Sequence, residues 1–369
     1  MKSVLSKVAA VLAVCSPAVL AAPQPRQSSP SWSGTNLYYL QGLSDDDQDA
    51  YIQKLSDYNV KVVRLWANRQ SSGCQKGSKL VNDVPALEDT IGQYNDETLD
   101  ALDKVLVKLV DKNIKTIISP HDGNSLINDY RKDAYYDRWG PGYFYEQQDA
   151  FDAYDNRLTH ILNYKGAHSG KVWKEWPEAI VSFNLQNEPM TAPYSNCQNG
   201  DPHGWACGRA RHMRDVLGAD NSILISTGGL GGDISHDCTF LPAVTECDAV
   251  DAISVHRYAS VPGYWSGSFS SWLDKSNGKK VYLEEWGIDA SKYDRNFAFP
   301  SEVEDMNSAG LPSLYWQILP AGSSECSYDP SQDSGDKFGI FDNSGVDLAG
   351  PINGATGVAA AQDWTGSVY

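Results

Sequence analysis

The feature of this chain that most restricts its fold is a regular alternation of β-prone runs with amphipathic, helix-like stretches. Leucines recur at helical spacing through residues 95–112, for example, and a strand-like run follows directly at 114–121. The alternation continues to residue 319 and includes eight strand-like runs. These are residues 33–40, 60–66, 114–121, 179–188, 222–229, 250–258, 279–286 and 312–319.

This alternation predicts a parallel sheet, because a helix between two strands returns the chain to the same edge of the sheet. Eight such units predict an α/β fold in which the sheet closes into a (β/α)8 TIM barrel, formed by a single domain. The alternative is an open doubly wound sheet, which would carry a glycine-rich phosphate turn after its first strand. Residues 35–42 contain no such turn, and the glycines at 227–232 lack the required spacing.

The first residues have the order of a secretory signal peptide. Lys2 precedes an apolar run at 8–20, and small residues lead to an expected cleavage after Ala21. We therefore expect a signal peptide at 1–21, a short Pro/Ser/Gln stretch at 22–31 and the barrel domain at 32–369. The apolar run is too short to span a bilayer, so the mature protein is expected to be secreted, extracellular and free of membrane segments.

Six cysteines remain once Cys15 is removed with the signal peptide. An even number of cysteines in an exported chain indicates disulfides. Proximity along the chain favours Cys197 with Cys207 and Cys238 with Cys247, which leaves the distant pair Cys74 and Cys326, although six cysteines permit about 15 connectivities.

Composition excludes some partners. The net charge of −17 argues against nucleic acid, because little positive charge is available to neutralise phosphates, and it suits a neutral substrate. The absence of C-x-x-C and H-x-x-x-H spacings gives no reason to expect a metal or another cofactor. The 11 Trp and 20 Tyr residues offer aromatic faces on which sugar rings stack. We expect a monomer.

In a barrel of this kind the active site lies at the C-terminal ends of the strands. Each polar or aromatic residue at these ends could serve packing alone, but together they would form one ring around the barrel mouth. The ring comprises Asn36, Tyr38, Arg64, Trp66, His121, Asn187, Glu188, His256, Tyr258, Glu284, Glu285, Trp316 and Gln317.

Two acids of this ring are expected to face each other. Glu188 follows the fourth strand and Glu285 lies in the seventh, across the barrel mouth. Glycoside hydrolysis uses such a pair, one acid to protonate the leaving oxygen and one carboxylate to attack the anomeric carbon. We expect a raised pKa for Glu188 and a normal or lowered pKa for Glu285. Strand alternation should turn the neighbouring Glu284 away from the mouth.

The motifs around these acids resemble those of a known family. "NEP" at 187–189 and "EWG" at 285–287 are similar to the signatures of clan A glycoside hydrolases, and of glycoside hydrolase family 5 in particular. "VRLW", "SPH", "HRY" and "YWQ" fall in that family's order. Within the family, the segments "GTNLYYL", "VRLWAN", "LEEWG" and "YWQ" most resemble fungal secreted endo-β-1,4-mannanases, whereas "NLQNEP" departs from their pattern.

The resemblance implies roles for individual residues. Glu188 would be the acid/base and Glu285 the nucleophile. Among the binding residues, Asn187 would donate to the sugar 2-hydroxyl, Arg64 would keep the nucleophile ionised, and Trp316 would stack on the sugar. The expected substrate-binding set is Arg64, His121, Asn187, His256, Tyr258, Trp316, Trp66 and Asn36, with His256 and Tyr258 orienting the acids and with Trp139 and Trp265 as further stacking candidates.

The function expected from these residues is that of a secreted, retaining endo-β-glycosidase acting on a plant or fungal cell-wall polysaccharide, with endo-β-1,4-mannanase favoured. An endo-β-1,4-glucanase or another family 5 β-glycanase or β-glycosidase is the alternative. A catalytically inactive carbohydrate-binding barrel is the alternative from a different class. A metal-dependent deacetylase is disfavoured, because the histidines are scattered along the chain.

Overall fold

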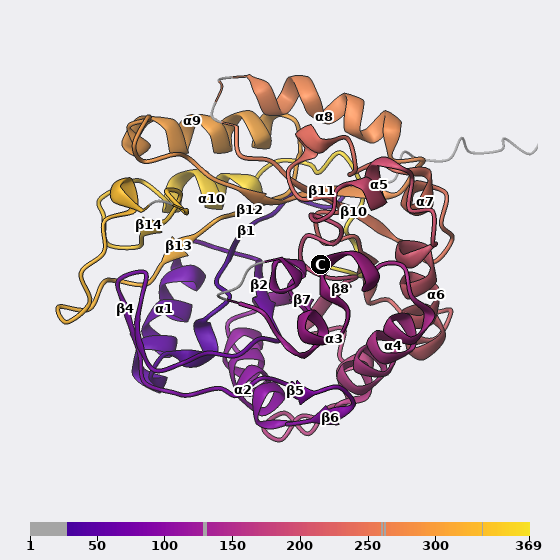
Figure 1. The fold of residues 1–369 in the computed structure, drawn as a ribbon. Coiled ribbons are helices and arrows are strands. Elements are labelled where there is room, and N and C mark those ends of the chain that lie inside the picture. Colours follow the sequence, from indigo (N-terminus) through magenta and orange to yellow (C-terminus); the bar gives the residue numbers. More distant parts are fainter. Residues whose placement is uncertain (1–27, 128–130, 260, 262, 334) are drawn as a thin grey trace, which may run out of the picture.

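A computed structural model describes residues 28–369, except for 128–130, 260, 262 and 334 (Figure 1). The expected signal peptide therefore lies outside the described residues. Eight parallel strands form a closed barrel and coincide with the eight runs expected from sequence, so the (β/α)8 prediction is confirmed. In order around the barrel they are β1 (Ser33–Asn36), β2 (Val62–Trp66), β7 (Lys115–Ser119), β8 (Ile180–Asn184), β9 (Leu224–Ser226), β10 (Ala252–His256), β11 (Lys280–Trp286) and β12 (Ser313–Tyr315).

Helices surround the barrel, as the view along its axis shows (Figure 1). The first is capped by Ser44, whose side chain accepts a hydrogen bond from the Asp47 backbone N–H at 3.1 Å. The α-helices are α1 (Asp45–Asp57), α2 (Glu97–Val110), α3 (Ala134–Tyr143), α4 (Gln148–Asn163), α5 (Ser195–Gln198), α6 (Trp205–Leu217), α7 (Pro242–Thr245), α8 (Tyr264–Lys275), α9 (Arg295–Ser308) and α10 (Ala349–Ala355).

Short elements lie in the loops. Two antiparallel hairpins follow β2, and one short parallel pair follows β12. The extra strands are β3 (Gly73–Gln75), β4 (Ser78–Leu80), β5 (Glu88–Thr90), β6 (Gln93–Tyr94), β13 (Ile318–Leu319) and β14 (Ile340–Phe341). The 3-10 turns are η1 (Leu40–Gly42), η2 (Gly123–Leu126), η3 (Trp173–Glu175), η4 (Ile234–His236) and η5 (Pro330–Gln332).

The apolar core has two parts. The larger part includes the buried faces of the surrounding helices. The smaller part includes residues from the first positions of several strands, such as Val62 and Ala252, and is completed by Trp32 and Trp364. Backbone hydrogen bonds of Ser29 and Ser31 with residues 358–360 place part of the expected N-terminal stretch against the C-terminal segment. None of the described helices is long and apolar enough to cross a membrane.

The disulfides correct two of the three expected pairs. Cys74–Cys326 forms as expected, but the other bridges are Cys197–Cys238 and Cys207–Cys247. Proximity along the chain fails as a guide here because the segment after β9 packs against both α5 and the start of α6.

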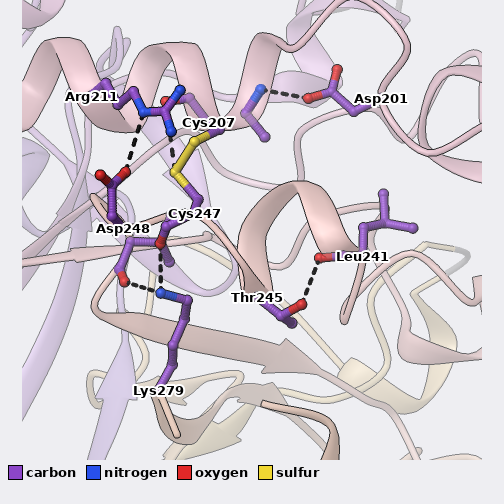
Figure 2. The surroundings of a disulfide bond; sticks show 10 residues. Asp201, Cys207, Arg211, Leu241, Thr245, Cys247, Asp248 and Lys279 are labelled. Carbon is purple, nitrogen blue, oxygen red and sulfur yellow. Dashed lines mark hydrogen bonds and ion pairs between the residues drawn. A yellow bond between two sulfur atoms is a disulfide. The ribbon is translucent and has the colours of Figure 1, made fainter. Parts of the chain in front are cut away.

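Figure 2 shows the surroundings of the Cys207–Cys247 bridge, which joins α6 to the segment before β10. Arg211 pairs with Asp248 at 3.2 Å, and the Lys279 ammonium donates to the Cys247 carbonyl at 2.6 Å. The bridge is therefore one of several links between these two segments.

We predict that proteolysis of the unreduced protein yields peptides that link Cys197 to Cys238 and Cys207 to Cys247. Mass spectrometry before and after reduction measures this, and the reduced digest serves as the control. A peptide joining Cys197 to Cys207 would contradict the fold of the loops beside the barrel mouth.

Candidate active site

Arg64, the middle residue of β2, lies at the centre of the candidate site. Its side chain is fully buried, and its Nη1 donates to Glu285 Oε1 at 2.5 Å. Three further N–H groups donate to asparagine carbonyl oxygens: Nε to Asn184 at 2.9 Å, Nη1 to Asn36 at 3.2 Å and Nη2 to Asn187 at 2.7 Å. Arg64 thus connects β1, β2, β8 and β11.

Both acids of the pair Glu284–Glu285 point into the barrel. The register of β10 with β11 shifts here, since Val255 pairs with Leu283 while the next residue, His256, pairs with Glu285. Glu284 is the extra residue of a β-bulge, which breaks the usual alternation of side chains. The expectation that strand alternation sends the two side chains to opposite faces is therefore wrong, but Glu285 is the one that lies beside Tyr258 and the His256 nitrogen facing Glu188.

Two hydrogen-bond donors contact the buried carboxylate of Glu285. Arg64 donates to Oε1, and the Tyr258 hydroxyl donates to Oε2 at 2.6 Å. Burial raises the pKa of Glu285 above its usual range, and the neighbouring Glu188 charge adds to this. His256, Arg64 and the Tyr258 hydrogen bond act in the opposite direction without cancelling the rise.

Glu188 lies beyond the end of β8. The predicted strand to residue 188 is too long, because β8 ends at Asn184 and Glu188 adopts a left-handed backbone with φ 45°. Its side chain is partly exposed, and it accepts hydrogen bonds from Asn124 Nδ2 at 2.9 Å and from His256 Nδ1 at 2.9 Å. Burial alone would raise the pKa of Glu188, but these hydrogen bonds and the His256 charge bring it below its usual range.

The pKa order expected from sequence is therefore reversed. Glu188 has a lowered pKa and Glu285 a raised one. Burial raises the pKa of both carboxyls, but Glu188 has the hydrogen bonds from Asn124 and from His256 Nδ1 at 2.9 Å, whereas His256 Nδ1 is 3.5 Å from Glu285 and the Glu188 charge raises the pKa of Glu285 further. One oxygen of Glu188, one oxygen of Glu285 and one His256 nitrogen all lie within 4.8 Å of one another.

His256 contacts carboxylates through both ring nitrogens. Nδ1 faces Glu188 and Glu285, and Nε2 lies 3.0 Å from Glu284 Oε2. Burial opposes its charge, but the three carboxylates raise the pKa of His256 to about 10, so the ring is an imidazolium at neutral pH. The Gly229 backbone lies against the ring, and a Cβ there would come within 2.5 Å of ring carbons, so only glycine fits.

Glu284 is fully buried below this ring. Besides His256, it accepts hydrogen bonds from Asn184 Nδ2 at 2.7 Å and from the Tyr282 hydroxyl at 2.6 Å, and Arg64 Nε lies 3.5 Å away. Burial opposes its ionisation, but Arg64 and His256 lower the pKa of Glu284 to about 2. It is therefore a permanent negative charge in the barrel interior.

The other expected binding residues differ in how they could reach a ligand. Asn187 accepts from Arg64 and donates one amide hydrogen to Asp122 at 2.8 Å, which leaves its second amide hydrogen free for another acceptor. His121 bonds to Asp133 at 2.6 Å and to Gln186 at 2.7 Å. Asn36 is fully buried and bonds to Arg64, so it supports the site from below.

Three aromatic rings cluster beside these residues. The Trp66 ring centroid is 5.2 Å from that of Tyr38 and 5.6 Å from that of Trp316. Trp66 is only 3% exposed, whereas Trp316 is partly exposed and donates through Nε1 to Asp336 at 2.8 Å. Of the three rings, Trp66 and Tyr38 line a cavity of about 780 Å³, together with His121.

That cavity lies beside the candidate site, and its lining includes residues of the loops at 67–75, 86–89 and 131–137. The two further tryptophans named as stacking candidates do not line it. Trp139 donates to Asp149 from a buried position in α3, and Trp265 is fully buried and donates to Glu302. Both are packing residues, and their selection from sequence as stacking residues is wrong.

Sequence reasoning missed three polar residues that contact this network. Asn124 hydrogen-bonds to Glu188, Asn184 connects Arg64 to Glu284, and Gln186 bonds to His121. Their signal was available, because Asn184 and Gln186 precede the "NEP" motif and Asn124 follows His121 by three residues.

Two groups of described residues could offer three metal-ligand atoms each. In one, Cys207 and Cys247 with Asp248, the two sulfurs form a disulfide and are not thiolates. In the other, Glu188, His256 and Glu285, the imidazolium is a hydrogen-bond donor and has no free lone pair for a metal. Neither group therefore has the donor chemistry of a metal site in this state.

A (β/α)8 barrel with acids paired at the ends of its fourth and seventh strands is the arrangement of clan A glycoside hydrolases. The family model described as GH family 5 β-mannosidase-like matches residues 27–285. The chain belongs to glycoside hydrolase family 5.

Similar proteins carry related names. Mannan endo-1,4-β-mannosidase 1 of Oryza sativa subsp. japonica is 21% identical over 345 residues, which cover 79% of this chain and 75% of that protein. The endo-1,4-β-mannanase from Rhizomucor miehei has a TM-score of 0.64 at 18% identity, covering 90% of this chain and 98% of the other. The exo-β-1,4-mannosidase from Opitutaceae bacterium strain TAV5 has a TM-score of 0.59 at 14% identity, covering 90% and 60%. At such identities the structures show a shared fold.

We predict that Tyr258→Phe moves the acidic limb of the pH dependence of kcat/KM to higher pH. The variant loses the hydroxyl that donates to Glu285, so the pKa of this carboxyl rises further. Activity on an aryl β-glycoside, measured from pH 3 to 8, tests this. Tyr264→Phe is the control, because its hydroxyl contacts Arg257 instead, and an unmoved acidic limb in Tyr258→Phe would contradict the assigned contact.

Proposed function

We propose that this protein is a secreted, retaining β-glycosidase that hydrolyses β-1,4-linked mannan within the chain. The observation that carries the proposal is the pairing of Glu188 and Glu285, with one oxygen of each within 4.8 Å. Retaining enzymes place their two carboxyl groups about 5–5.5 Å apart, whereas inverting enzymes need about 6.5–9.5 Å for a water molecule. The close pairing therefore supports a covalent glycosyl-enzyme intermediate.

In the first step, Glu285 attacks the anomeric carbon while Glu188 delivers a proton to the leaving oxygen. Arg64 and the Tyr258 hydroxyl donate to Glu285 and favour its ionised form, which makes the attack. The free amide hydrogen of Asn187 points to a role in binding the sugar 2-hydroxyl. Trp316, the partly exposed ring of the aromatic cluster, supplies a stacking face for the sugar.

In the second step, water replaces the leaving sugar. Glu188, now a carboxylate, takes a proton from this water, whose oxygen attacks the anomeric carbon and releases Glu285. Two displacements at the same carbon retain the β configuration. Asn124 holds the second oxygen of Glu188 and keeps its carboxyl plane fixed through both steps.

The substrate is proposed from three observations taken together. The family model is β-mannosidase-like, and the relatives from rice and Rhizomucor miehei are named as endo-acting mannanases. The cavity of about 780 Å³, lined in part by Tyr38 and Trp66, lies beside the candidate site and provides room for neighbouring sugar units. Its polar lining, which includes His121 and Asp122, suits sugar hydroxyls.

Exo-acting cleavage of short mannosides is the second candidate. The Lys76 ammonium lies 5.4 Å from the ring centroids of both Tyr38 and Trp316 and pairs with Asp336. The hairpin that carries Lys76 is joined by Cys74–Cys326 to the loop after β12. This bridged pair of loops beside Trp316 favours a cleft that is closed on that side.

The secreted location is proposed from the disulfides and from the sequence. Three disulfides are typical of proteins folded in an oxidising compartment, and the signal-like segment at 1–21 gives a route to it. An inactive carbohydrate-binding barrel is disfavoured, because both acids and their hydrogen-bond donors are present.

We predict that Glu188→Ala and Glu285→Ala each lower kcat by about 10⁴-fold or more while the fold is retained. Azide should rescue both on a dinitrophenyl β-mannoside, with opposite stereochemistry. In Glu285→Ala, azide attacks once and gives the α-azide. In Glu188→Ala, it intercepts the glycosyl-enzyme and gives the β-azide. NMR of the products distinguishes the two azide anomers. Glu304→Gln, on the exposed face of α9, is the control and should keep normal activity. Interchanged anomers would overturn the assigned roles of Glu188 and Glu285.

We predict that the protein hydrolyses mannan when it is tested on mannan, cellulose, xylan and galactan. Mixed mannooligosaccharides should appear early, with the new reducing ends first as the β-anomer by NMR. Release of mannose alone would favour the exo candidate, and Lys76→Ala should then increase the share of longer products. Activity confined to another polymer would reject mannan and retain the acid pair.

A further inference from the structure

The site poses a question about the catalytic proton. The residue proposed to protonate the leaving oxygen, Glu188, has a lowered pKa, while the pKa of His256 beside it is raised to about 10. His256 Nδ1 lies 2.9 Å from Glu188 Oε1, within hydrogen-bond distance for passing a proton. The hydrogen-bond partner of His256 Nε2 decides which of the two ring protons can leave.

That partner is Glu284, whose hydrogen bonds allow one arrangement only. Its Oε2 lies 3.0 Å from His256 Nε2, and a carboxylate can only accept, so Nε2 must carry hydrogen. Its Oε1 faces Asn184 Nδ2 at 2.7 Å, the Tyr282 hydroxyl at 2.6 Å and Arg64 Nε at 3.5 Å. Since Glu284 is fully buried, water cannot replace any of these partners without a change in the barrel interior.

The opposite nitrogen faces the catalytic acids. Nδ1 is 2.9 Å from Glu188 Oε1 and 3.5 Å from Glu285 Oε2. With Nε2–H held by Glu284, loss of a proton from the ring leaves the neutral Nε2–H tautomer, and the proton that leaves is the one on Nδ1. The same logic applies where a carboxylate holds a catalytic histidine in one tautomer.

We propose that Glu284 is a positioning residue that fixes the tautomer of His256, so that His256 Nδ1 stores the proton that Glu188 passes to the leaving group. This inference rests on the proposed function. The proton moves from Nδ1 to Glu188 Oε1 as the bound sugar excludes water, and Glu188 then passes it to the glycosidic oxygen. The bond from that oxygen to the anomeric carbon breaks as the bond to Glu285 forms. In the second step the proton that Glu188 takes from water returns to Nδ1.

The groups around His256 decide how its charge responds to substitution. Glu188 faces it from the loop after β8, and Glu284 and Glu285 face it from β11. Arg64, from β2, contacts both glutamates of β11.

Other polar and charged groups close to His256, on the segment after β10 and on the loop after β9, interact with partners other than His256. Asp233 pairs with Arg257 at 2.8 Å, and the Tyr258 hydroxyl donates to Glu285. The three glutamates are thus the groups that keep His256 charged.

Glu284→Gln tests the proposal with one atom changed. The amide oxygen must face the donors Asn184 and Arg64, so the amide NH₂ faces His256 Nε2 and donates to it. His256 Nε2 then becomes an acceptor, and the ring becomes neutral with its hydrogen on Nδ1. Imidazole ¹⁵N NMR of histidine-labelled protein reads this directly, with His256 assigned by comparison with a His256→Asn variant.

The kinetic expectations follow from the lost proton. We expect kcat to fall by roughly 10²–10⁴-fold, the range typical of general acid catalysis, with KM little changed because Glu284 is buried away from substrate. Loss of the His256 charge raises the pKa of Glu285, so the acidic limb of the kcat/KM profile should move up by roughly one unit or more. The lost Glu284 charge opposes this weakly, since Glu285 interacts chiefly with His256, Arg64 and Glu188.

Two variants separate positioning from simple structural support. Glu284→Asp keeps the charge and should restore the doubly protonated ring and part of kcat. Glu302→Gln removes a buried carboxyl that accepts from Trp265, outside the site, and should leave the pH profile unchanged.

Two results would overturn the proposal: a doubly protonated His256 in Glu284→Gln at neutral pH, or a kcat loss with an unmoved pH profile in a variant whose Tm is unchanged. If the protein hydrolyses none of the sugars tested, the proposed function fails while the NMR result still decides the tautomer.

Discussion

The buried positive charge of Arg64 is the constraint on which the rest of the site depends. A fully buried guanidinium is tolerated only if its charge is balanced and its N–H groups are bonded. Glu285 and Glu284 supply the charge, and three asparagines from β1, β8 and the loop after β8 accept the remaining hydrogen bonds. Because these partners come from three other barrel strands or their ends, satisfying Arg64 requires the closed barrel and at the same time positions the nucleophile candidate.

The β-bulge in β11 extends this arrangement. An alternating strand would present one glutamate to the interior, which could balance Arg64 or serve as nucleophile. The bulge presents two, so the negative charges are divided between a deep carboxylate with a pKa of about 2 and an upper carboxylate with a raised pKa. The cost of burying a second acid is offset by Asn184, Tyr282 and His256, which donate to Glu284.

Charge balance then explains where the mobile proton lies. Three carboxylates surround His256, and Arg64 is the one permanent cation among these five groups. With a neutral His256 the cluster carries two net negative charges, and with a protonated His256 it carries one. The same proton placed on Glu188 would leave His256 neutral beside two buried anions. A sugar that displaces water from Glu188 shifts this balance, because a desolvated carboxylate binds a proton more tightly.

Particular residues show which parts of the fold and of the site could be predicted from the sequence. The eight strands and the proximity of Glu188 and Glu285 could be predicted, since they depend on local periodicity and on the rule that the strands of a parallel barrel end at one face. The strand-end residues Arg64, Tyr258, His256 and Asn187 followed from the same rule. The family motifs added roles that periodicity alone does not contain.

What only the tertiary structure decided concerns contacts between segments distant in sequence. The bulge at Glu284 depends on the register of β11 against β10, which no single strand encodes. The pairing of Cys197 with Cys238 depends on how a loop lies over α5, and the burial of Trp139 and Trp265 depends on which helix face meets its neighbour. The pKa order of Glu188 and Glu285 depends on burial and on the partners that each carboxyl meets, such as His256 Nδ1, which is 2.9 Å from Glu188 and 3.5 Å from Glu285. A sequence determines which residues reach the barrel mouth, but their charges are set by distances that exist only after the barrel has closed.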